Sequence, residues 1–306
     1  MIKTLIVHHN DADGRCAAAI VIKARQKPLG NTACIEADYK DIRNAAWTEN
    51  LLAFSRAAEE VWIVDFSFPP DLMEAIQFQK VFGGVVWIDH HKTASGYPYS
   101  HLPGLRDFSN KGPAACELAW KFLFPRMAVP RLVTLVGDYD SWRLEHPESS
   151  AVRVALEAKA WARDPKSDGW RAWLQDDDGA AALVADGYTM MEFRDGYCAS
   201  MAKSYGFETR FEGLRCYAMN IYGMGSQVFG AKMKQYDACL SFVFDGKLFT
   251  VGLYSEREEV DCGAICKKHG GGGHKGAAGF QCDLLPFGLE SAAQPVGAEA
   301  EGPPQA

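Results

Sequence analysis

The sequence lacks paired cysteines and long apolar runs, and these absences exclude several classes of protein. Its nine cysteines are scattered, and none forms a Cys-x-x-Cys pair, which argues against a zinc ribbon and against a secreted disulfide framework. There is no run of 18 apolar residues, and the first residues contain neither a long hydrophobic region nor a small-residue cleavage site. We therefore expect a cytoplasmic protein with no membrane partner.

The sequence also lacks an excess of positive charge. Its net charge of −7 disfavours broad electrostatic contact with long duplex nucleic acid, although a short polyanion can still bind locally. Apolar residues make up 48% and charged residues 23%, which is typical of a soluble globular protein. A length of 306 residues is enough for two domains, each with its own core.

Four apolar, β-rich runs alternate with helix-like stretches in the first half of the chain. The runs occupy residues 4–9, 32–37, 60–68 and 83–91, and helix-like stretches follow at 14–25 and 70–81. This alternation predicts a parallel sheet in an α/β layer. Ligands of such sheets bind at the carboxyl ends of the strands.

The rest of the sequence predicts further helices and a smaller α+β domain. Residues 111–124 and 129–142 have helical patterns, and strand-like alternation begins at residue 211, with "FDGK" as a hairpin signal. We predict a catalytic domain with a helical extension over residues 1–205, and a second domain over 210–285. Residues 288–306, rich in Gly, Ala, Pro and Glu, are predicted to be a disordered tail.

Histidine and aspartate gather where the first predicted strand ends. His9, Asp11 and Asp13 are spaced by two, which directs them to roughly the same side, and Gly14 permits a tight turn into the following helix. Buried carboxylates side by side repel one another unless a cation lies between them. An aspartate that caps the helix is the alternative interpretation, but it explains only one of the two carboxylates.

The same donor types recur at two other strand ends and at one helix end. Asp65 ends the run "VWIVD", with a helix cap as its alternative; Asp89, His90 and His91 follow the fourth run; Asp138 lies near the end of a predicted helix. Mixed Asp and His ligation favours Mn²⁺ or Mg²⁺ and disfavours structural zinc. The number of carboxylates suggests two ions that share one bridge, as in in-line phosphoryl displacement.

The second predicted domain contains "KKHGGGGHKGAAGF", residues 267–280. Its four glycines leave backbone N–H groups accessible to an anion, and His274 and Lys275 add charge-capable donors. A flexible linker is the alternative, but the flanking residues are apolar or basic and not serine-rich.

Five motifs together resemble the DHH family of phosphoesterases: "VHHNDADG", "VDFSF", "IDHHK", "VGDYDSW" and "GGGGHKGAAGF". The last is similar to the glycine segment of the DHH-associated C-terminal domain, and the match spans roughly residues 5–285. The first motif is most similar to the branch of short-oligonucleotide exonucleases called nanoRNases. The resemblance implies a manganese-dependent hydrolase with its active site in the cleft between two domains.

The resemblance also implies a role for each residue of the motifs. His9 and Asp11 would bind one ion and Asp13 the other, Asp65 would bridge the two, and His90 and Asp138 would complete the set of ligands of the second ion. Asp89 would orient His90, and His91 would face the scissile phosphate.

In the second domain the resemblance implies a group of residues that hold a phosphate or terminal nucleotide of the substrate. These are Gly271, Gly272, Gly273, His274 and Lys275. Many members of the family carry an arginine in a Ser-x-Arg segment before the glycines. The corresponding stretch here is "LYSEREEVD", in which Arg257 is the candidate.

The function implied is hydrolysis of short oligonucleotides by a water that two metal ions activate. A cyclic-dinucleotide or 3'-phosphoadenosine 5'-phosphate hydrolase is the alternative, and a pyrophosphatase or a non-catalytic nucleotide-binding protein is less favoured. Trp62 and Trp87 lie in apolar runs and are expected in the core, whereas Trp142 is expected near the site. The oligomeric state stays open, with a homodimer among the alternatives.

Overall fold

The computed structural model describes residues 2–25, 29–79, 84–175 and 177–288. The chain folds into two compact units, one ending at Met191 and the other beginning at Glu192, so the border lies inside helix α8 (Asp177–Tyr205). Apart from Gly288, the predicted disordered tail lies outside the described residues. None of the helices within these ranges is long and apolar enough to cross a membrane.

The first unit contains a four-stranded parallel sheet, which confirms the predicted fold class. Its strands lie in the order β2-β1-β3-β4 and are β1 (Thr4–His9), β2 (Thr32–Ala37), β3 (Glu60–Val64) and β4 (Val85–Ile88). Every pairing in it is parallel, so the carboxyl ends of the strands meet at one edge. The ends of β1, β3 and β4, where the predicted site residues lie, are therefore side by side.

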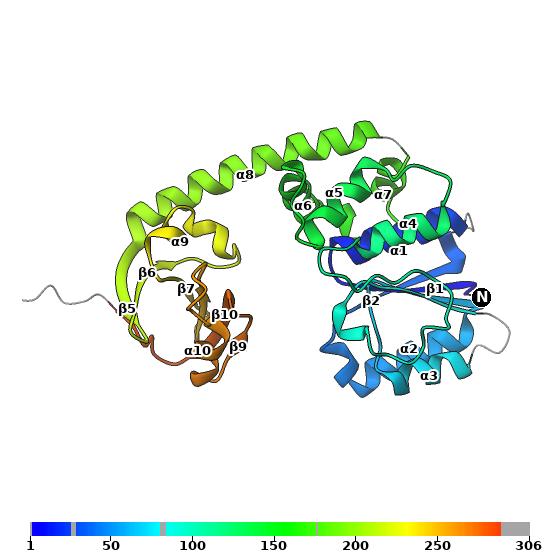
Figure 1. Cartoon of the computed structure of the whole chain (residues 1–306), viewed down its shortest axis with the longest axis horizontal. Helices are drawn as coiled ribbons and strands as arrows, with labels where there is room; N and C mark the ends of the chain where they lie inside the picture. Colours follow the sequence, from blue (N-terminus) through cyan, green and yellow to red (C-terminus); the bar gives the residue numbers. More distant parts are fainter. Residues whose placement is uncertain (1, 26–28, 80–83, 176, 289–306) are drawn as a thin grey trace, which may run out of the picture. The chain divides into compact units, whose positions relative to one another are not determined.

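Helices cover both faces of this sheet (Figure 1). Helices α1 (Ala12–Arg25) and α4 (Ala115–Leu123) lie on one face, and α2 (Ala45–Ala57) and α3 (Pro70–Phe78) lie on the other. Alternate strand residues feed two separate cores: Trp62 packs with α1 and α4, and Trp87 packs with α2 and α3. Both tryptophans are buried, as predicted.

Further helices pack on the α1 side of the sheet. They are α5 (Arg131–Asp140), α6 (Glu148–Ala158) and α7 (Asp168–Trp173), and their apolar side chains join the core that α1 and α4 form. The helices predicted over 111–124 and 129–142 correspond to α4 and α5. The predicted run ends later than α5 because the backbone turns sharply after Asp140.

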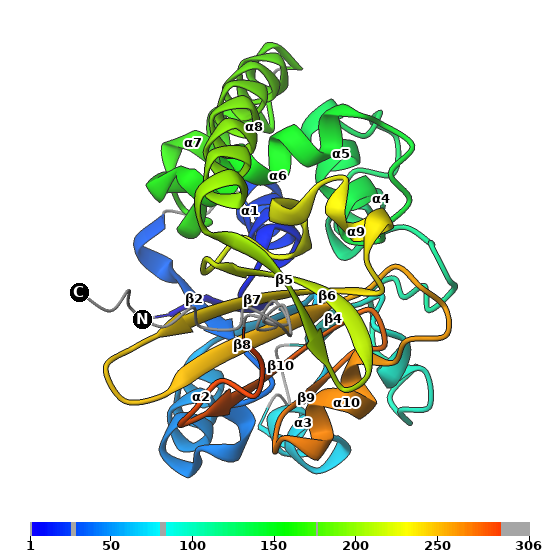
Figure 2. The same ribbon diagram turned by 90° about the vertical axis from the view of Figure 1, so that its left-hand side faces the viewer.

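The second unit is built on a mixed sheet with strand order β5-β6-β7-β8-β10-β9. The strands are β5 (Gly206–Phe211), β6 (Leu214–Asn220), β7 (Ala238–Phe244), β8 (Phe249–Tyr254), β9 (Gly272–Gly273) and β10 (Ala277–Cys282). Strands β7 and β8 form the hairpin predicted at "FDGK", yellow to orange in Figure 2. Helix α10 (Cys262–Lys268) packs on one face, and α9 (Lys232–Gln235) packs on the other.

Gly14 explains how β1 passes into α1 within a few residues. A Cβ at this position would lie 2.5 Å from the carbonyl oxygen of His9, a backbone atom that cannot move aside. The close approach of the helix to the strand end therefore requires glycine.

We expect Gly14→Ala to destabilise the first unit by about 2 kcal/mol or more, because the added methyl group forces the backbone apart. All eight tryptophans lie in this unit, so urea unfolding followed by tryptophan fluorescence measures its stability. Gly96→Ala is the matched control, because a Cβ there meets nothing within 4 Å. Equal stability of the two variants would contradict the packing argument.

Candidate metal centre

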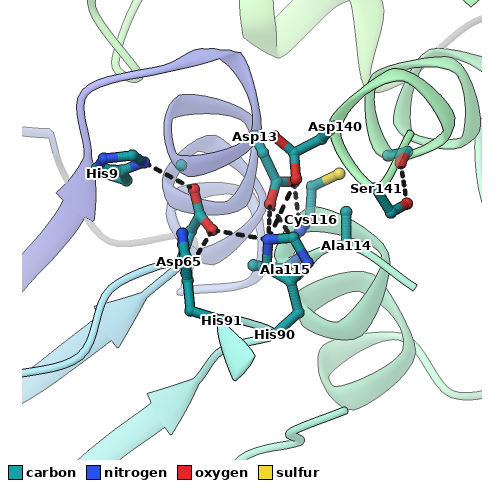
Figure 3. A network of polar contacts seen from close by, with 12 residues as sticks. His9, Asp13, Asp65, His90, His91, Ala114, Ala115, Cys116, Asp140 and Ser141 are labelled. Atoms are coloured by element: carbon teal, nitrogen blue, oxygen red, sulfur yellow. Dashed lines mark hydrogen bonds and ion pairs between the residues drawn. The ribbon is translucent and has the colours of Figure 1, made fainter. Parts of the chain in front are cut away.

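The carboxyl ends of three strands and the end of one helix bring histidines and aspartates together (Figure 3). The ligand atoms form three overlapping groups, within each of which they lie no more than 4.8 Å apart. The groups are His9, Asp11 and Asp65; Asp65, His90 and His91; and Asp13, His90 and Asp140. Asp65 and His90 each belong to two groups, so the arrangement is one continuous cluster.

Asp65 lies at the centre of this cluster, directly after β3. Its side chain is 1% exposed, and no described residue donates a hydrogen bond to either carboxylate oxygen. One oxygen lies 3.7 Å from His9 Nδ1, and the other lies 3.3 Å from His90 Nε2 and 3.6 Å from His91 Nδ1. Its backbone has a φ of 55°, an unusual conformation for a residue other than glycine. It is not a helix cap, since α3 is capped at Pro69.

Asp11 serves two purposes at the start of α1. One oxygen accepts a hydrogen bond from the backbone N–H of Gly14 at 2.9 Å, which caps the helix, and the other lies 2.7 Å from His9 Nδ1. The capping interpretation and the ligand interpretation are therefore compatible. His8 is buried with its Nδ1 2.8 Å from the His9 carbonyl oxygen, so His9 is the histidine that the structure brings to the cluster.

Asp13, His90 and Asp140 make up the other end of the cluster. His90 Nε2 lies 3.1 Å from Asp140 and 3.7 Å from Asp13. The buried Asp13 carboxylate also accepts hydrogen bonds from the backbone N–H groups of Ala115 and Cys116, at 2.9 and 2.8 Å. These two groups belong to the N-terminus of α4, which stabilises negative charge.

The structure places Asp138 differently from the expectation that it is a ligand. Its buried carboxylate accepts hydrogen bonds from the backbone N–H groups of Glu145 and His146, at 3.0 and 3.1 Å, and from the hydroxyl of Ser149. These bonds hold the turn after α5. Asp140, which is two residues further along and which the sequence analysis did not assign, is the α5 carboxylate in the cluster.

Asp89 also acts on a different partner from the expected one. Its carboxylate lies 2.7 Å from the ring Nδ1 of His91, whereas it contacts His90 only through the backbone N–H, at 2.8 Å. Asp89 is fully buried, and Ser67 donates a further hydrogen bond to it. Asp89 thus orients the His91 ring, with Nδ1 as the donor and Nε2 left available.

The electrostatics of the cluster oppose its ionisation in the absence of a cation. Burial, followed by the charges of neighbouring aspartates, raises the pKa of Asp65 well above its usual range and that of Asp13 to about 6. Burial alone would lower the pKa of His90, but the hydrogen bond with Asp140 and the charges of Asp13, Asp140 and Asp89 together outweigh it and raise that pKa to about 9. Asp13 and Asp65 tend to take up protons, and His90 tends to keep its own.

A divalent cation fits this donor set. The donors are carboxylate oxygens and imidazole nitrogens without a thiolate, which suits Mn²⁺ or Mg²⁺. Both oxygens of Asp65 lack a hydrogen-bond donor among the described residues, an expensive state for a buried carboxylate unless positive charge lies beside it.

The structure explains two of the three candidate substrate-binding glycines by packing alone. A Cβ at Gly271 would lie 2.1 Å from the Gly279 carbonyl oxygen, and one at Gly273 would lie 2.5 Å from Ala278 Cα. Gly272 is exposed and a Cβ there would meet nothing within 4 Å, so packing does not require glycine at that position.

The other candidate binding residues of the second unit lie on its surface. His274 and Lys275 are exposed, and their backbones bond to Ala277 and Cys262. Arg257 follows Ser255 with the Ser-x-Arg spacing, and its Nε lies 3.5 Å from Asp237. No described contact tests their binding roles, which stay predictions.

Three comparisons with known proteins bear on the fold. No family model matches the sequence. Over 240 residues, or 72% of this chain, it is 21% identical to the uncharacterized protein R106 of Acanthamoeba polyphaga mimivirus, and the chain spans about half (53%) of that protein's length. Among solved structures it is similar to the pGpG-specific phosphodiesterase PggH from Vibrio cholerae, with a TM-score of 0.55, 12% identity and coverage of 92% of this chain and 93% of the other.

The chain is also similar to the DHH domain of PF0399, described as a member of the s1p family of ribosomal proteins. The TM-score is 0.55 at 14% identity, over 91% of this chain and 82% of the other. The chain therefore has the fold of DHH-domain proteins, as the five sequence motifs predicted, with both units included in the match.

We expect the stability of the metal-free protein to fall as pH rises from 5 to 9. In the folded chain Asp13 and Asp65 keep protons that the unfolded chain releases near pH 4. His90 keeps its proton until about pH 9, whereas the unfolded chain releases it near pH 6.5. Because the folded chain holds more of these protons throughout this range, stability falls as pH rises. With excess Mn²⁺ the stabilisation should instead grow with pH, because ligands must lose their protons to bind. Urea midpoints in chelator and in Mn²⁺ measure this; parallel pH profiles would be inconsistent with a metal site here.

We expect Asp138 and Asp140 to differ in what their loss impairs. Asp138→Ala leaves two backbone donors and a hydroxyl unpaired and should cost about 2 kcal/mol or more of stability. Asp140→Asn removes both the ion pair with His90 and the repulsion of Asp13 and Asp65, so it should change stability in chelator by less than Asp138→Ala does. It should weaken Mn²⁺ binding at least roughly tenfold, since even outer partners of metal ligands are worth about 10–100-fold. Calorimetric Mn²⁺ titration and urea unfolding separate the two effects, and the reverse pattern would restore Asp138 as the ligand.

Proposed function

We propose that this chain is a metal-dependent phosphoesterase that hydrolyses phosphodiester bonds of nucleotides or short oligonucleotides. The observation that carries the proposal is the carboxylate of Asp65. It is buried, its oxygens accept no hydrogen bond from a described residue, and each oxygen faces a different histidine of the cluster. This is the arrangement that a carboxylate bridging two cations requires.

In this proposal His9 and Asp11 hold one Mn²⁺ or Mg²⁺ ion, and Asp65 bridges it to a second ion. Asp13, His90 and Asp140 hold the second ion. Such a pair of ions, when bound, lowers the pKa of a coordinated water and stabilises the charge of the attacking and leaving oxygens. The hydrogen bonds from α4 to Asp13 and from Gly14 to Asp11 keep these two carboxylates oriented for their task.

We assign His91 to the scissile phosphate. The bond between its Nδ1 and the buried Asp89 restrains ring rotation and leaves Nε2 free to contact a phosphate oxygen. Asp89 is thus a positioning residue, and its own hydrogen bond from Ser67 holds it in place.

The substrate class is supported by two observations. A fold neighbour, PggH, is a phosphodiesterase specific for the dinucleotide pGpG, and the similarity extends over 92% of this chain. The net charge of −7 limits the number of phosphates that the protein can neutralise. We propose that Gly272, His274, Lys275 and Arg257 contact a phosphate of the substrate, as the exposed positions of the first three permit.

The test is turnover of a substrate panel with added Mn²⁺: linear dinucleotides, oligomers of two to five nucleotides, a strand of about 20, cyclic dinucleotides, 3'-phosphoadenosine 5'-phosphate and pyrophosphate. We expect the short linear oligomers to be hydrolysed fastest, with a shallow salt dependence that corresponds to about two to four phosphates. Preference for a cyclic dinucleotide or for 3'-phosphoadenosine 5'-phosphate would change the substrate assignment. Hydrolysis of none of them would reject the proposal.

Asp65→Asn is the matched inactive variant for this panel. The amide is almost the same size as the carboxylate but carries no charge to share between two cations, so we expect at least roughly a hundredfold loss of turnover. The urea midpoint in chelator should be retained or raised, since the amide stays neutral in a position where burial opposes ionisation of the carboxyl group. Wild-type turnover in this variant would exclude the two-metal arrangement.

A further inference from the structure

A pocket of about 220 Å³ adjoins the candidate metal centre within the first unit. Three cluster carboxylates, Asp11, Asp13 and Asp140, line one side of it. The remaining wall comes from the start of α1, the end of α5, the turn after it and α6, and consists of Ala12, Val136, Tyr139, Trp142, Ser149, Val152, Arg153 and Leu156. The pocket thus joins charged metal-binding groups to an aromatic and apolar surface.

Trp142 is an unusual residue to find at the mouth of a pocket. Its side chain is 57% exposed, although a large apolar ring is normally buried. Its backbone has a φ of 53°, a conformation that a residue with a side chain adopts only at a cost. Both the exposure and the strain are unfavourable for folding, so neither explains why the ring is held there.

The turn that carries Trp142 is held from several sides. The backbone N–H of Trp142 bonds to the Tyr139 carbonyl oxygen at 3.0 Å, and those of Arg143 and Leu144 bond to the carbonyl oxygen of Asp138. The Asp138 carboxylate secures the far side of the turn. Asp138 therefore affects the site although it does not belong to the cluster. It secures the turn that carries Trp142, and this turn follows directly on Asp140.

Tyr139 adds a second aromatic wall. Its ring meets that of Trp142 edge to face, with centroids 5.5 Å apart, and the guanidinium of Arg153 lies 5.6 Å from the Tyr139 ring centroid. An aromatic wall, an apolar floor and a few polar groups are the features that bind a flat heteroaromatic ring. The volume lies below the roughly 300–1,000 Å³ of pockets for drug-sized ligands, so it suits one ring system and excludes a dinucleotide.

We propose that this pocket binds the nucleobase of the nucleotide whose phosphate lies at the metal centre, with Trp142 as the stacking surface. This inference rests on the proposed function and deepens it, because it locates the part of the substrate that is not a phosphate. Stacking on a tryptophan discriminates little among bases, since each base has a π face. The pocket therefore favours nucleotides over pyrophosphate and other phosphate compounds without a base.

The test compares equilibrium binding of AMP and of ribose 5-phosphate to the Mn²⁺-loaded full chain by calorimetry. The two ligands share the sugar and the phosphate, so the ratio of their Kd values isolates the base. Stacking of a base on an aromatic side chain is worth about 1–3 kcal/mol, so the wild-type ratio should be about 5- to 150-fold in favour of AMP. A ratio near one in the wild-type protein would overturn the inference.

Three variants assign the effect to the ring. Trp142→Ala should reduce the ratio to near one through weaker AMP binding alone, whereas Trp142→Phe should keep most of it. Leu144→Ala is the matched control, because Leu144 is an exposed apolar residue of the same turn, also at positive φ, that does not line the pocket. We expect it to bind as the wild type does.

Equal weakening of both ligands by Trp142→Ala would show that the ring supports the metal centre and not the base, which would overturn the inference. Binding does not require turnover, so the failure of this inference and that of the proposed function are distinguishable. If AMP binds more tightly than ribose 5-phosphate but no panel substrate is hydrolysed, the nucleobase pocket is supported and the phosphoesterase activity is rejected. If panel substrates are hydrolysed but the Kd ratio is near one, the phosphoesterase activity is supported and the nucleobase pocket is rejected.

Discussion

A buried carboxylate that accepts no hydrogen bond from any described residue is the constraint on which the first unit depends. Asp65 is surrounded by other carboxylates and by histidines, and its side chain is almost fully buried. A chain gains nothing in stability from such a residue, and its positive φ adds to the cost. A proton on the carboxyl group or a cation beside it relieves this cost, and the parallel sheet provides the strand ends that surround it.

The residues around Asp65 are tied to the secondary structure that holds them. Asp11 caps α1, and Asp13 accepts two hydrogen bonds from the first turn of α4. Helix N-termini favour negative charge, so both carboxylates stay deprotonated more readily than burial alone would allow. The residues of the cluster and the helices that cover one face of the sheet are thus parts of the same hydrogen-bonded structure.

The sequence was sufficient to predict the parallel sheet, a smaller α+β second domain and most of the residues of the cluster. Apolar runs of strand length, each ending in polar residues, predict where parallel strands end, and the geometry of such sheets then brings those ends together. Two predicted roles of single side chains differ from the structure: Asp138 as a ligand in the cluster, and Asp89 as the partner of the His90 ring. Asp138 and Asp140 lie two residues apart on α5 and so point in different directions, and which one reaches the cluster depends on where the helix ends.

The sequence could not predict that Asp89 pairs with His91, for a related reason. Two adjacent histidines both lie within range of a preceding aspartate, and only the backbone conformation after β4 decides which ring meets the carboxylate. The role of Trp142 also depends on a turn conformation that sequence patterns do not specify, because φ is positive at two residues of that turn, neither of them glycine. Patterns predict elements well, and they predict the directions of side chains in irregular segments poorly.

Strand β3 links the two cores and the cluster in a way that limits how this chain can change in length. Its residues alternate between the core under α1 and α4 and the core over α2 and α3, and Asp65 follows immediately. Insertion or deletion of one residue in β3 would exchange the two sets of side chains and displace the carboxylate in the same step. The length of the chain between the start of β3 and Asp65 is therefore fixed by both cores at once, and loops away from the strand ends are where we expect insertions to be tolerated.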